Sequence, residues 1–297
     1  MLTEPEIARV LSYERLIPAM EQTLAAFSAG KAQQPVRSVL TVEEGQRFFG
    51  IMPAVTQGGM GAKLVCFYPK NAAAGLPTHL ATIVLFDTET ARPLACLDGR
   101  LITEMRTAAV SAAVTRHLAP AEVRVLAILG SGVQAQAHLK ALGHVCRFEE
   151  VRVWSRDMAH ARRFAERHGA RAMDAESAVR GADVIITATS SREPVLRGEW
   201  LKRGAHVNAV GACLPSWREL DDAALTDSTL VVDSREAALK ESGDVILSGA
   251  PIFAEAGEVF SGTRRPPRES TTVFKSLGLA VEDIAAARLV YDAVQAG

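Results

Sequence analysis

The stretch GSGVQA, residues 130–135, has the residue types and spacing needed to bind a dinucleotide. It follows a short apolar run and opens a helical pattern, which is the context in which G-x-G-x-x-A binds a pyrophosphate. Gly130 would permit the tight turn, Gly132 would let the backbone approach the phosphates, and Ala135 would let the helix pack closely on the strand. The free N–H groups at the helix start would receive the anion. The expected cofactor contacts here come from Gly130, Ser131, Gly132, Val133 and Gln134.

The end of the next apolar run, EEVRVW, indicates which dinucleotide is bound. In NAD-binding proteins an acidic residue about 20 positions after the turn binds the ribose 2′-hydroxyl. This chain instead has Ser155 and Arg156 after Trp154, and a guanidinium favours a 2′-phosphate. Asp157 follows at the start of a helical pattern, where a capping carboxylate is common. We therefore expect NADPH, with NADH bound more weakly; the alternative is that Arg156 is an ordinary solvated side chain.

Three isolated cations precede the glycine turn. Arg37 stands alone in QPVRSVL, Lys63 alone in GAKLVCF, and Arg106 at the start of the alanine-rich pattern RTAAVSAAV. A cation at the N-terminal end of a helix opposes the helix dipole, so we expect an anion near Arg106. Each cation by itself is more commonly a surface residue. Together they indicate a site for a carboxylate substrate.

The first third of the chain mixes helix and strand signals. Residues 4–29 have the pattern of an amphipathic helix or helix pair that ends at Gly30. Strand-like runs follow at 37–41, 46–52, 62–67 and 80–87, separated by turn sequences such as QGGMG. A helix is then predicted over 103–117. This part has the pattern of an α+β domain.

From Glu122 onward, short apolar runs alternate with helical segments, the pattern of βαβ units on a parallel sheet. The apolar runs are VRVLAIL, EEVRVW, ADVIITAT, AHVNAV and TLVVD, and one helical segment ends at Gly169. Near Thr272 the alternation gives way to a predicted final helix, 281–294. We therefore predict an α/β protein with a Rossmann-type parallel-sheet domain over 116–280, preceded by an α+β domain over 1–115.

Composition limits the class of partner. The 297 residues are 48% apolar with a formal net charge of −1, which gives no electrostatic case for nucleic acid or an anionic membrane. The N-terminus lacks the apolar core of a secretory signal, and no apolar run approaches a membrane-spanning length. Four cysteines are scattered without metal-ligand spacing. We expect a cytoplasmic protein with reduced thiols, no metal and a small-molecule partner.

With these residues in view, the chain strongly resembles the ornithine cyclodeaminase/mu-crystallin family over nearly its whole length. The last two of the matching segments are similar to the mu-crystallin branch, the ketimine reductases. The segments, in chain order, are QPVR (34–37), GAKLV (61–65), MRTAAVSA (105–112), GSGVQAQAHL (130–139), NAVGA (208–212), VVDSREAALKESGD (231–244) and TTVFKSLGLAVED (271–283).

The resemblance implies a homodimer whose N-terminal substrate-binding domain forms the interface, rejoined by the C-terminal helix, 281–297. It implies that Arg37, Lys63 and Arg106 hold the substrate carboxylate or line the reacting centre, and that Glu241 lies in the ligand pocket. Further cofactor contacts are implied for Thr78, His79, Arg106, Ser155, Arg156, Ala188, Thr189, Val210 and Ser276.

One departure from the family bears on the reaction. Ornithine cyclodeaminases carry an aspartate shortly after the NAVGG-type turn, where this chain has Cys213. A neutral thiol cannot replace a carboxylate base unless its pKa is strongly lowered. We therefore expect NAD(P)H-dependent reduction of a cyclic imino acid, such as Δ1-pyrroline-2-carboxylate or Δ1-piperideine-2-carboxylate. Arg106 and Arg37 would hold the carboxylate, and Lys63 would serve as proton donor or as part of a water relay.

Three alternatives stay open at this stage. The first is an amino-acid dehydrogenase of the alanine type, and the second is ornithine cyclodeamination itself. The third belongs to another class, a protein that binds NADPH and a small thyroid hormone-like molecule.

Overall fold

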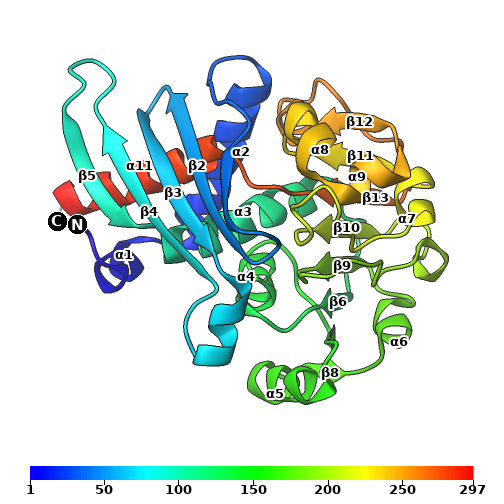
Figure 1. The fold of residues 1–297 in the computed structure, drawn as a ribbon. Helices are drawn as coiled ribbons and strands as arrows, with labels where there is room; N and C mark the ends of the chain where they lie inside the picture. Colours follow the sequence, from blue (N-terminus) through cyan, green and yellow to red (C-terminus); the bar gives the residue numbers. More distant parts are fainter. Residues whose placement is uncertain (297) are drawn as a thin grey trace. The chain divides into compact units, whose positions relative to one another are not determined.

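A computed structural model describes residues 1–296 (Figure 1). The chain divides into two compact units, the first formed by Met1–Arg106 with Gly278–Gly297 and the second by Thr107–Leu277. The helix α3, Gly99–Leu118, runs through the point of division. The domain boundary expected at 115/116 therefore falls inside a continuous helix, and the observed division lies nine residues earlier in the chain, at 106/107.

Among the described residues, the first unit contains a five-stranded antiparallel sheet of order β1-β2-β3-β4-β5. Its strands are β1 Ser38–Glu43, β2 Arg47–Thr56, β3 Gly59–Phe67, β4 His79–Phe86 and β5 Pro93–Asp98, with a short 3-10 helix, η1 Pro69–Ala74, between β3 and β4. Met52, Ile83 and Leu97 point to one face of the sheet and are buried. Helix α11, Ala280–Ala296, packs on β2 and β3 and against helix α2, Tyr13–Ser28. These contacts form the core of the first unit.

The helix or helix pair expected over 4–29 is a pair, α1 Glu4–Val10 and α2, and Gly30 follows it with a positive φ of 72°. Two other elements of this unit differ from the sequence predictions. Strand β5 was not predicted. The helix predicted from Thr103 begins at Gly99, where the Asp98 carboxylate accepts a hydrogen bond from the Arg100 N–H at 2.8 Å. This cap places Arg106 well inside α3, so the assumption that Arg106 stands at the helix start was wrong.

The second unit contains an eight-stranded sheet whose pairs are all parallel, in the order β12-β11-β13-β10-β9-β6-β7-β8 (Figure 1). Its strands are β6 Val125–Leu129, β7 Glu150–Trp154, β8 Arg171–Ala172, β9 Val184–Thr187, β10 His206–Ala209, β11 Thr229–Val232, β12 Ile252–Glu255 and β13 Thr272–Lys275. Its helices include α4 Val133–Leu142, α5 Met158–His168, α6 Ala175–Val179, α7 Asp222–Thr226, α8 Arg235–Glu241, α9 Gly243–Ser248 and α10 Ala256–Phe260, with a 3-10 turn, η2 Gly198–Trp200.

The strand order reverses at β6. The chain moves from β6 outward to β7 and β8, and then returns to place β9 on the other side of β6. In doubly wound sheets a ligand binds beside the carboxyl ends of the strands at such a switch point. The segment at Thr272, where the alternation was expected to end, forms strand β13 and inserts between β10 and β11.

Candidate functional site

A buried cluster of charges occupies the first unit. The Lys63 ammonium lies 2.7 Å from the Asp283 carboxylate, and its side chain is only 2% exposed. The Arg106 guanidinium reaches the same carboxylate at 2.8 Å through Nε and the Glu282 carboxylate at 2.6 Å through Nη1. Both carboxylates are fully buried. Burying ions is costly unless they are paired in this way, so the cluster needs all four groups.

Strand β3 and helix α11 position these charges. Lys63 stands opposite Met52 and Ile83 on the buried face of the sheet. Glu282 and Asp283 lie in the first turn of α11, where the helix dipole stabilises negative charge. Gly278 precedes that helix with φ of 77°, and a Cβ there would lie 2.4 Å from Arg106 Nη1. Glycine is therefore required at 278 both for the backbone conformation and for the guanidinium beside it.

Burial and the charges of the cluster lower the pKa values of Lys63 and His79. Burial lowers the pKa of Lys63 to about 8, with Asp283 opposing the shift and Arg106 adding to it. Burial, followed by the charges of Lys63 and Arg106, lowers the pKa of His79 to about 4. Lys63 can therefore hold or release a proton near neutral pH, while His79 is neutral there.

The three cations singled out in the sequence are brought into one neighbourhood. Arg37 donates a hydrogen bond from Nη2 to the carbonyl of Gly278 at 2.9 Å, and its charge contributes to the lowered pKa of Lys63. The anion expected near Arg106 is present as the pair Glu282 and Asp283, which sequence reasoning did not assign to the site. Two adjacent acidic residues at the start of a predicted helix were the available signal.

The glycine turn of the second unit has the geometry that its sequence predicts. Gly130 directly follows strand β6 with φ of 126°, and a Cβ there would lie 2.5 Å from the Ala188 carbonyl oxygen. Gly132 is the N-cap of α4 without a side-chain hydrogen bond, and a Cβ there would meet no heavy atom within 4 Å. Ala135 is fully buried behind it. The N-terminus of α4 therefore faces open space, as a pyrophosphate site requires.

The residues after strand β7 lie at the same carboxyl-end edge of the sheet as the glycine turn. Ser155 accepts a hydrogen bond from the Ser131 hydroxyl at 3.1 Å, which links the two strand ends. Arg156 is exposed. Asp157 caps α5 by accepting the Ala159 N–H at 2.8 Å, as predicted. The carboxylate of Asp157 is engaged locally, so Arg156 is the charged side chain of this pair that is available to a ligand.

Other expected cofactor residues lie at the carboxyl ends of neighbouring strands. Ala188 and Thr189 follow β9, Val210 follows β10, and Ser276 follows β13. Within residues 1–296, the buried Ser276 Oγ and Gln134 Oε1 have no hydrogen-bond partner, which is unusual for buried polar atoms. Open space at Gly132 and these unsatisfied atoms fit a dinucleotide with its phosphates and amide. Glu241 ends α8 and is half-buried; Thr78 precedes β4 in the first unit and accepts the Tyr68 N–H through its carbonyl.

Two other kinds of feature are absent from the described residues. No group of three or more His, Cys, Asp or Glu side chains among them could hold a metal ion. None of the helices that they form is long and apolar enough to cross a membrane.

A doubly wound parallel sheet with a glycine turn at its switch point, joined to an α+β unit with a buried lysine–arginine cluster, defines a two-unit protein of the dinucleotide-binding class. The sequence model of the ornithine cyclodeaminase/mu-crystallin family matches residues 1–297, and the chain belongs to that family. The resemblance seen in the sequence is thereby confirmed.

One relative and two solved structures show which proteins this chain is similar to. The ketimine reductase mu-crystallin of Mus musculus is 51% identical over 290 residues, which cover 95% of this chain and 93% of the relative. The structure of Thermococcus litoralis Delta(1)-pyrroline-2-carboxylate reductase in complex with NADH and L-proline has a TM-score of 0.94 at 35% identity, covering 99% and 97% of the two chains. An archaeal alanine dehydrogenase dimer with bound NAD has a TM-score of 0.93 at 34% identity, covering 99% and 95%.

Proposed function

We propose that the protein is an NADP-preferring reductase of cyclic ketimines, which converts Δ1-pyrroline-2-carboxylate or Δ1-piperideine-2-carboxylate to the cyclic amino acid. The single observation that carries this proposal is the buried Lys63 ammonium, which shares the Asp283 carboxylate with Arg106. The similarity to a ketimine reductase and to a pyrroline-2-carboxylate reductase supports the same reaction. The direct test is oxidation of NADPH by each cyclic imine; turnover with neither would contradict the proposal.

The charges of the cluster fit a substrate with one carboxylate. Arg37, Lys63 and Arg106 are cationic, Glu282 and Asp283 are anionic, and His79 is neutral. Among these named groups the cations outnumber the anions by one, which favours the binding of an anionic substrate. In this reaction the arginines would hold the substrate carboxylate, which fixes the orientation of the imine.

Lys63 would supply the proton. An ammonium whose pKa lies near the working pH can transfer a proton to an imine nitrogen and be protonated again from solvent. Bound NADPH supplies hydride to the imine carbon. The amine nitrogen gains the proton that Lys63 loses, so the product is a secondary amine with its carboxylate intact. Because no strong base acts in this scheme, the half-buried thiol at Cys213 is no obstacle to it.

The reduction of an open-chain imine is the second candidate. The similarity to the alanine dehydrogenase dimer favours it, and the same cationic cluster would hold the carboxylate of pyruvate. Initial rates with pyruvate plus ammonia, compared with those of the cyclic imines, separate the two reactions. Faster turnover with pyruvate plus ammonia would favour the second candidate.

Preference for NADPH rests on Arg156. We expect Arg156→Ala to weaken NADPH binding roughly tenfold to a hundredfold, because a charge-assisted contact contributes about 1.5–3 kcal/mol. NADH binding should change little. Calorimetric dissociation constants for both cofactors check this, with Arg163→Ala as the control, since Arg163 is also exposed on α5 nearby. Equal losses for NADPH and NADH would remove the 2′-phosphate assignment.

We also infer that the protein forms a homodimer through the outer face of the five-stranded sheet. Leu40, Phe49, Cys66 and Leu80 form one cross-strand row on that face, and Leu40 and Leu80 are 55% and 46% exposed. A row of exposed apolar side chains marks a protein interface. We expect Leu80→Glu to halve the mass measured by light scattering. The control Leu239→Glu, at an exposed position on α8, should keep the wild-type mass; an unchanged mass for Leu80→Glu would contradict the interface.

A further inference from the structure

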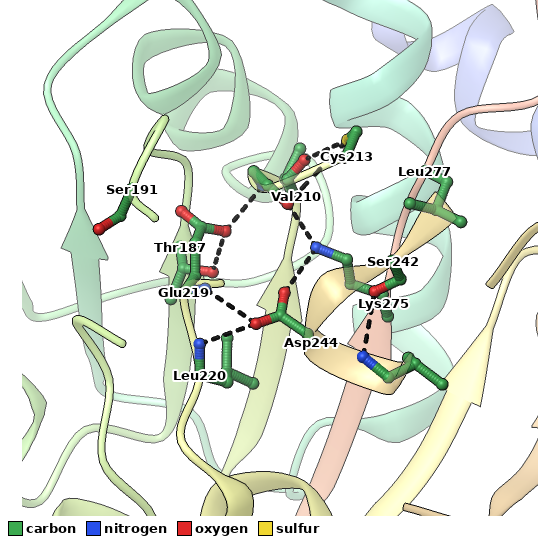
Figure 2. A network of polar contacts seen from close by, with 12 residues as sticks. Thr187, Ser191, Val210, Cys213, Glu219, Leu220, Ser242, Asp244, Lys275 and Leu277 are labelled. Carbon is green, nitrogen blue, oxygen red and sulfur yellow. Dashed lines mark hydrogen bonds and ion pairs between the residues drawn. The ribbon is translucent and has the colours of Figure 1, made fainter. Parts of the chain in front are cut away.

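A buried polar network joins the carboxyl ends of three neighbouring strands in the second unit (Figure 2). It is built on Glu219, Asp244 and Lys275, whose side chains are fully buried. Two carboxyl groups and one ammonium lie together here, and Asp244 pairs with Lys275 at 2.9 Å. Burial raises the pKa of Glu219, although Lys275 opposes the shift. Burying a carboxyl group inside a protein costs free energy. The hydrogen bonds of Glu219 show which parts of the backbone this group holds in place.

Glu219 connects the loops that follow β9 and β10. One carboxylate oxygen accepts the Thr189 N–H at 2.5 Å and the Thr189 hydroxyl at 2.7 Å. The other accepts the Thr187 hydroxyl at 2.7 Å and the Gly211 N–H at 2.8 Å. All four donors belong to the two strand ends or to the residues directly after them. Glu219 itself lies in the connection between β10 and α7, and its carboxylate joins the end of β9 to the start of that connection.

Asp244 and Lys275 support this clamp and extend it to β13. Asp244 accepts the N–H groups of Glu219 and Leu220 at 2.8 and 3.0 Å through one oxygen, and lies 2.9 Å from the Lys275 ammonium through the other. Lys275 also donates to the Gly211 carbonyl. Both backbone polar groups of Gly211, its N–H and its carbonyl, are therefore hydrogen-bonded to the network.

The backbone beside Gly211 needs this support. Ala212 has φ of 55°, a conformation that costs a non-glycine residue of order 1 kcal/mol or more. A Cβ at Gly211 would lie 2.1 Å from the Thr189 carbonyl oxygen, so the two loops are in close contact. The network thus fixes the shape of residues 187–189 and 210–213 together (Figure 2).

In a doubly wound sheet each half of the fold binds one mononucleotide. The glycine turn and Arg156 belong to the half with β6 and β7, while β9, β10 and β13 belong to the other. Resting on the proposed function, we propose that Glu219 is a positioning residue that shapes the β9 and β10 loops for the nicotinamide half of the cofactor.

Glu219→Gln tests this proposal. The amide keeps the size of the side chain but turns its NH2 group toward one pair of donors, so the Gly211 N–H or the Thr189 N–H loses its acceptor. We expect the dissociation constant for NADPH to rise about tenfold, a loss of roughly 1.4 kcal/mol. Binding of 2′-phospho-ADP-ribose, which is the cofactor without nicotinamide, should change less than about twofold. Calorimetry with both probes measures the two values.

A matched control lies at the opposite edge of the same sheet. The Asp183 carboxylate accepts the N–H groups of Arg124 and Val125, each at 2.8 Å, and pairs with Lys202. Asp183 thereby connects strands β6 and β9 at their amino ends, whereas the ligand is expected at the carboxyl ends. Asp183→Asn should lower the melting temperature and leave both dissociation constants unchanged. If Asp183→Asn weakens NADPH as much as Glu219→Gln does, the effect is one of general stability and the proposal is wrong.

Thr187→Val provides a second, milder variant. It removes the Thr187 hydroxyl that donates to the Glu219 carboxylate, while valine keeps the shape of the threonine side chain. It should weaken NADPH about threefold and spare 2′-phospho-ADP-ribose. Equal losses for both probes, or no loss in either variant, would overturn the positioning role while leaving the proposed function intact. Wild-type protein that binds neither probe would contradict the proposed function and this proposal with it.

Discussion

Replacing Lys63 with methionine is expected to lower the turnover of cyclic imine reduction by at least ~10²-fold, since general acid catalysis contributes roughly 10²–10⁴-fold. Methionine keeps a long unbranched side chain but has no acidic proton to donate. The KM for the imine should change much less than kcat, because the arginines that bind the carboxylate remain. Steady-state oxidation of NADPH with Δ1-pyrroline-2-carboxylate measures both constants. Turnover near that of the wild type would remove Lys63 from the mechanism.

The pH dependence of the wild-type enzyme gives an independent check of the same role. Burial lowers the pKa of Lys63 to about 8, so the protonated donor disappears as the pH rises through that value. We expect kcat to fall above about pH 8. Lys63→Arg keeps a positive charge that does not titrate in this range, so its residual activity should lack this decline. A decline of the same form in the arginine variant would assign it to another group.

Loss of activity above pH 8 is not expected to reflect unfolding driven by Lys63. The folded pKa of about 8 lies below the ordinary lysine value of 10.5, so between these values the unfolded chain binds more protons than the native one. The free energy of unfolding contributed by this group therefore rises with pH in that window. Thermal unfolding measured at pH 7 and pH 9 separates the two effects.

Asp283→Asn is expected to produce the largest loss of stability, about 3–5 kcal/mol, because it breaks a buried ion pair. Asp283 contacts both Lys63 and Arg106 and has no exposed surface. Burial by itself would raise the pKa of Asp283, but Arg106 and Lys63 outweigh burial and hold it below the ordinary value. The carboxylate is therefore ionised, and an amide at 283 leaves two buried cations with only Glu282. Urea unfolding measures the change in free energy.

The matched control is Asp292→Asn on the same helix. Asp292 pairs with Arg288 at 2.8 Å, but both side chains are substantially exposed, so its loss should cost no more than about 1 kcal/mol. Asp283→Asn should also move the decline of kcat to a lower pH, because the charge that favours protonated Lys63 is gone. Similar unfolding free energies for the two variants would show that the buried cluster is not essential for stability.

The dinucleotide turn could be predicted because its signals are local. Gly130, Gly132 and Ala135 all lie within one strand–turn–helix unit. Asp157 likewise acts locally, because it caps the helix α5 that begins at the next residue. Strand β13 could not be placed, because its neighbours β10 and β11 are chosen by the packing of the whole sheet. The early start of α3 was missed although its cap, Asp98, is also local.

The sequence by itself determined the α/β class, the glycine turn and the three cations, since these follow from short-range spacing and residue type. Only the tertiary structure decided what the cations face. Arg106 meets Glu282 and Asp283 across 176 and 177 positions of chain, and Glu219 reaches Thr187 across 32. The hydrophobic periodicity of the sequence does not reveal such contacts. They form only in the folded protein, where charged side chains from separate elements are buried together and each must be paired with an opposite charge or hydrogen-bonded.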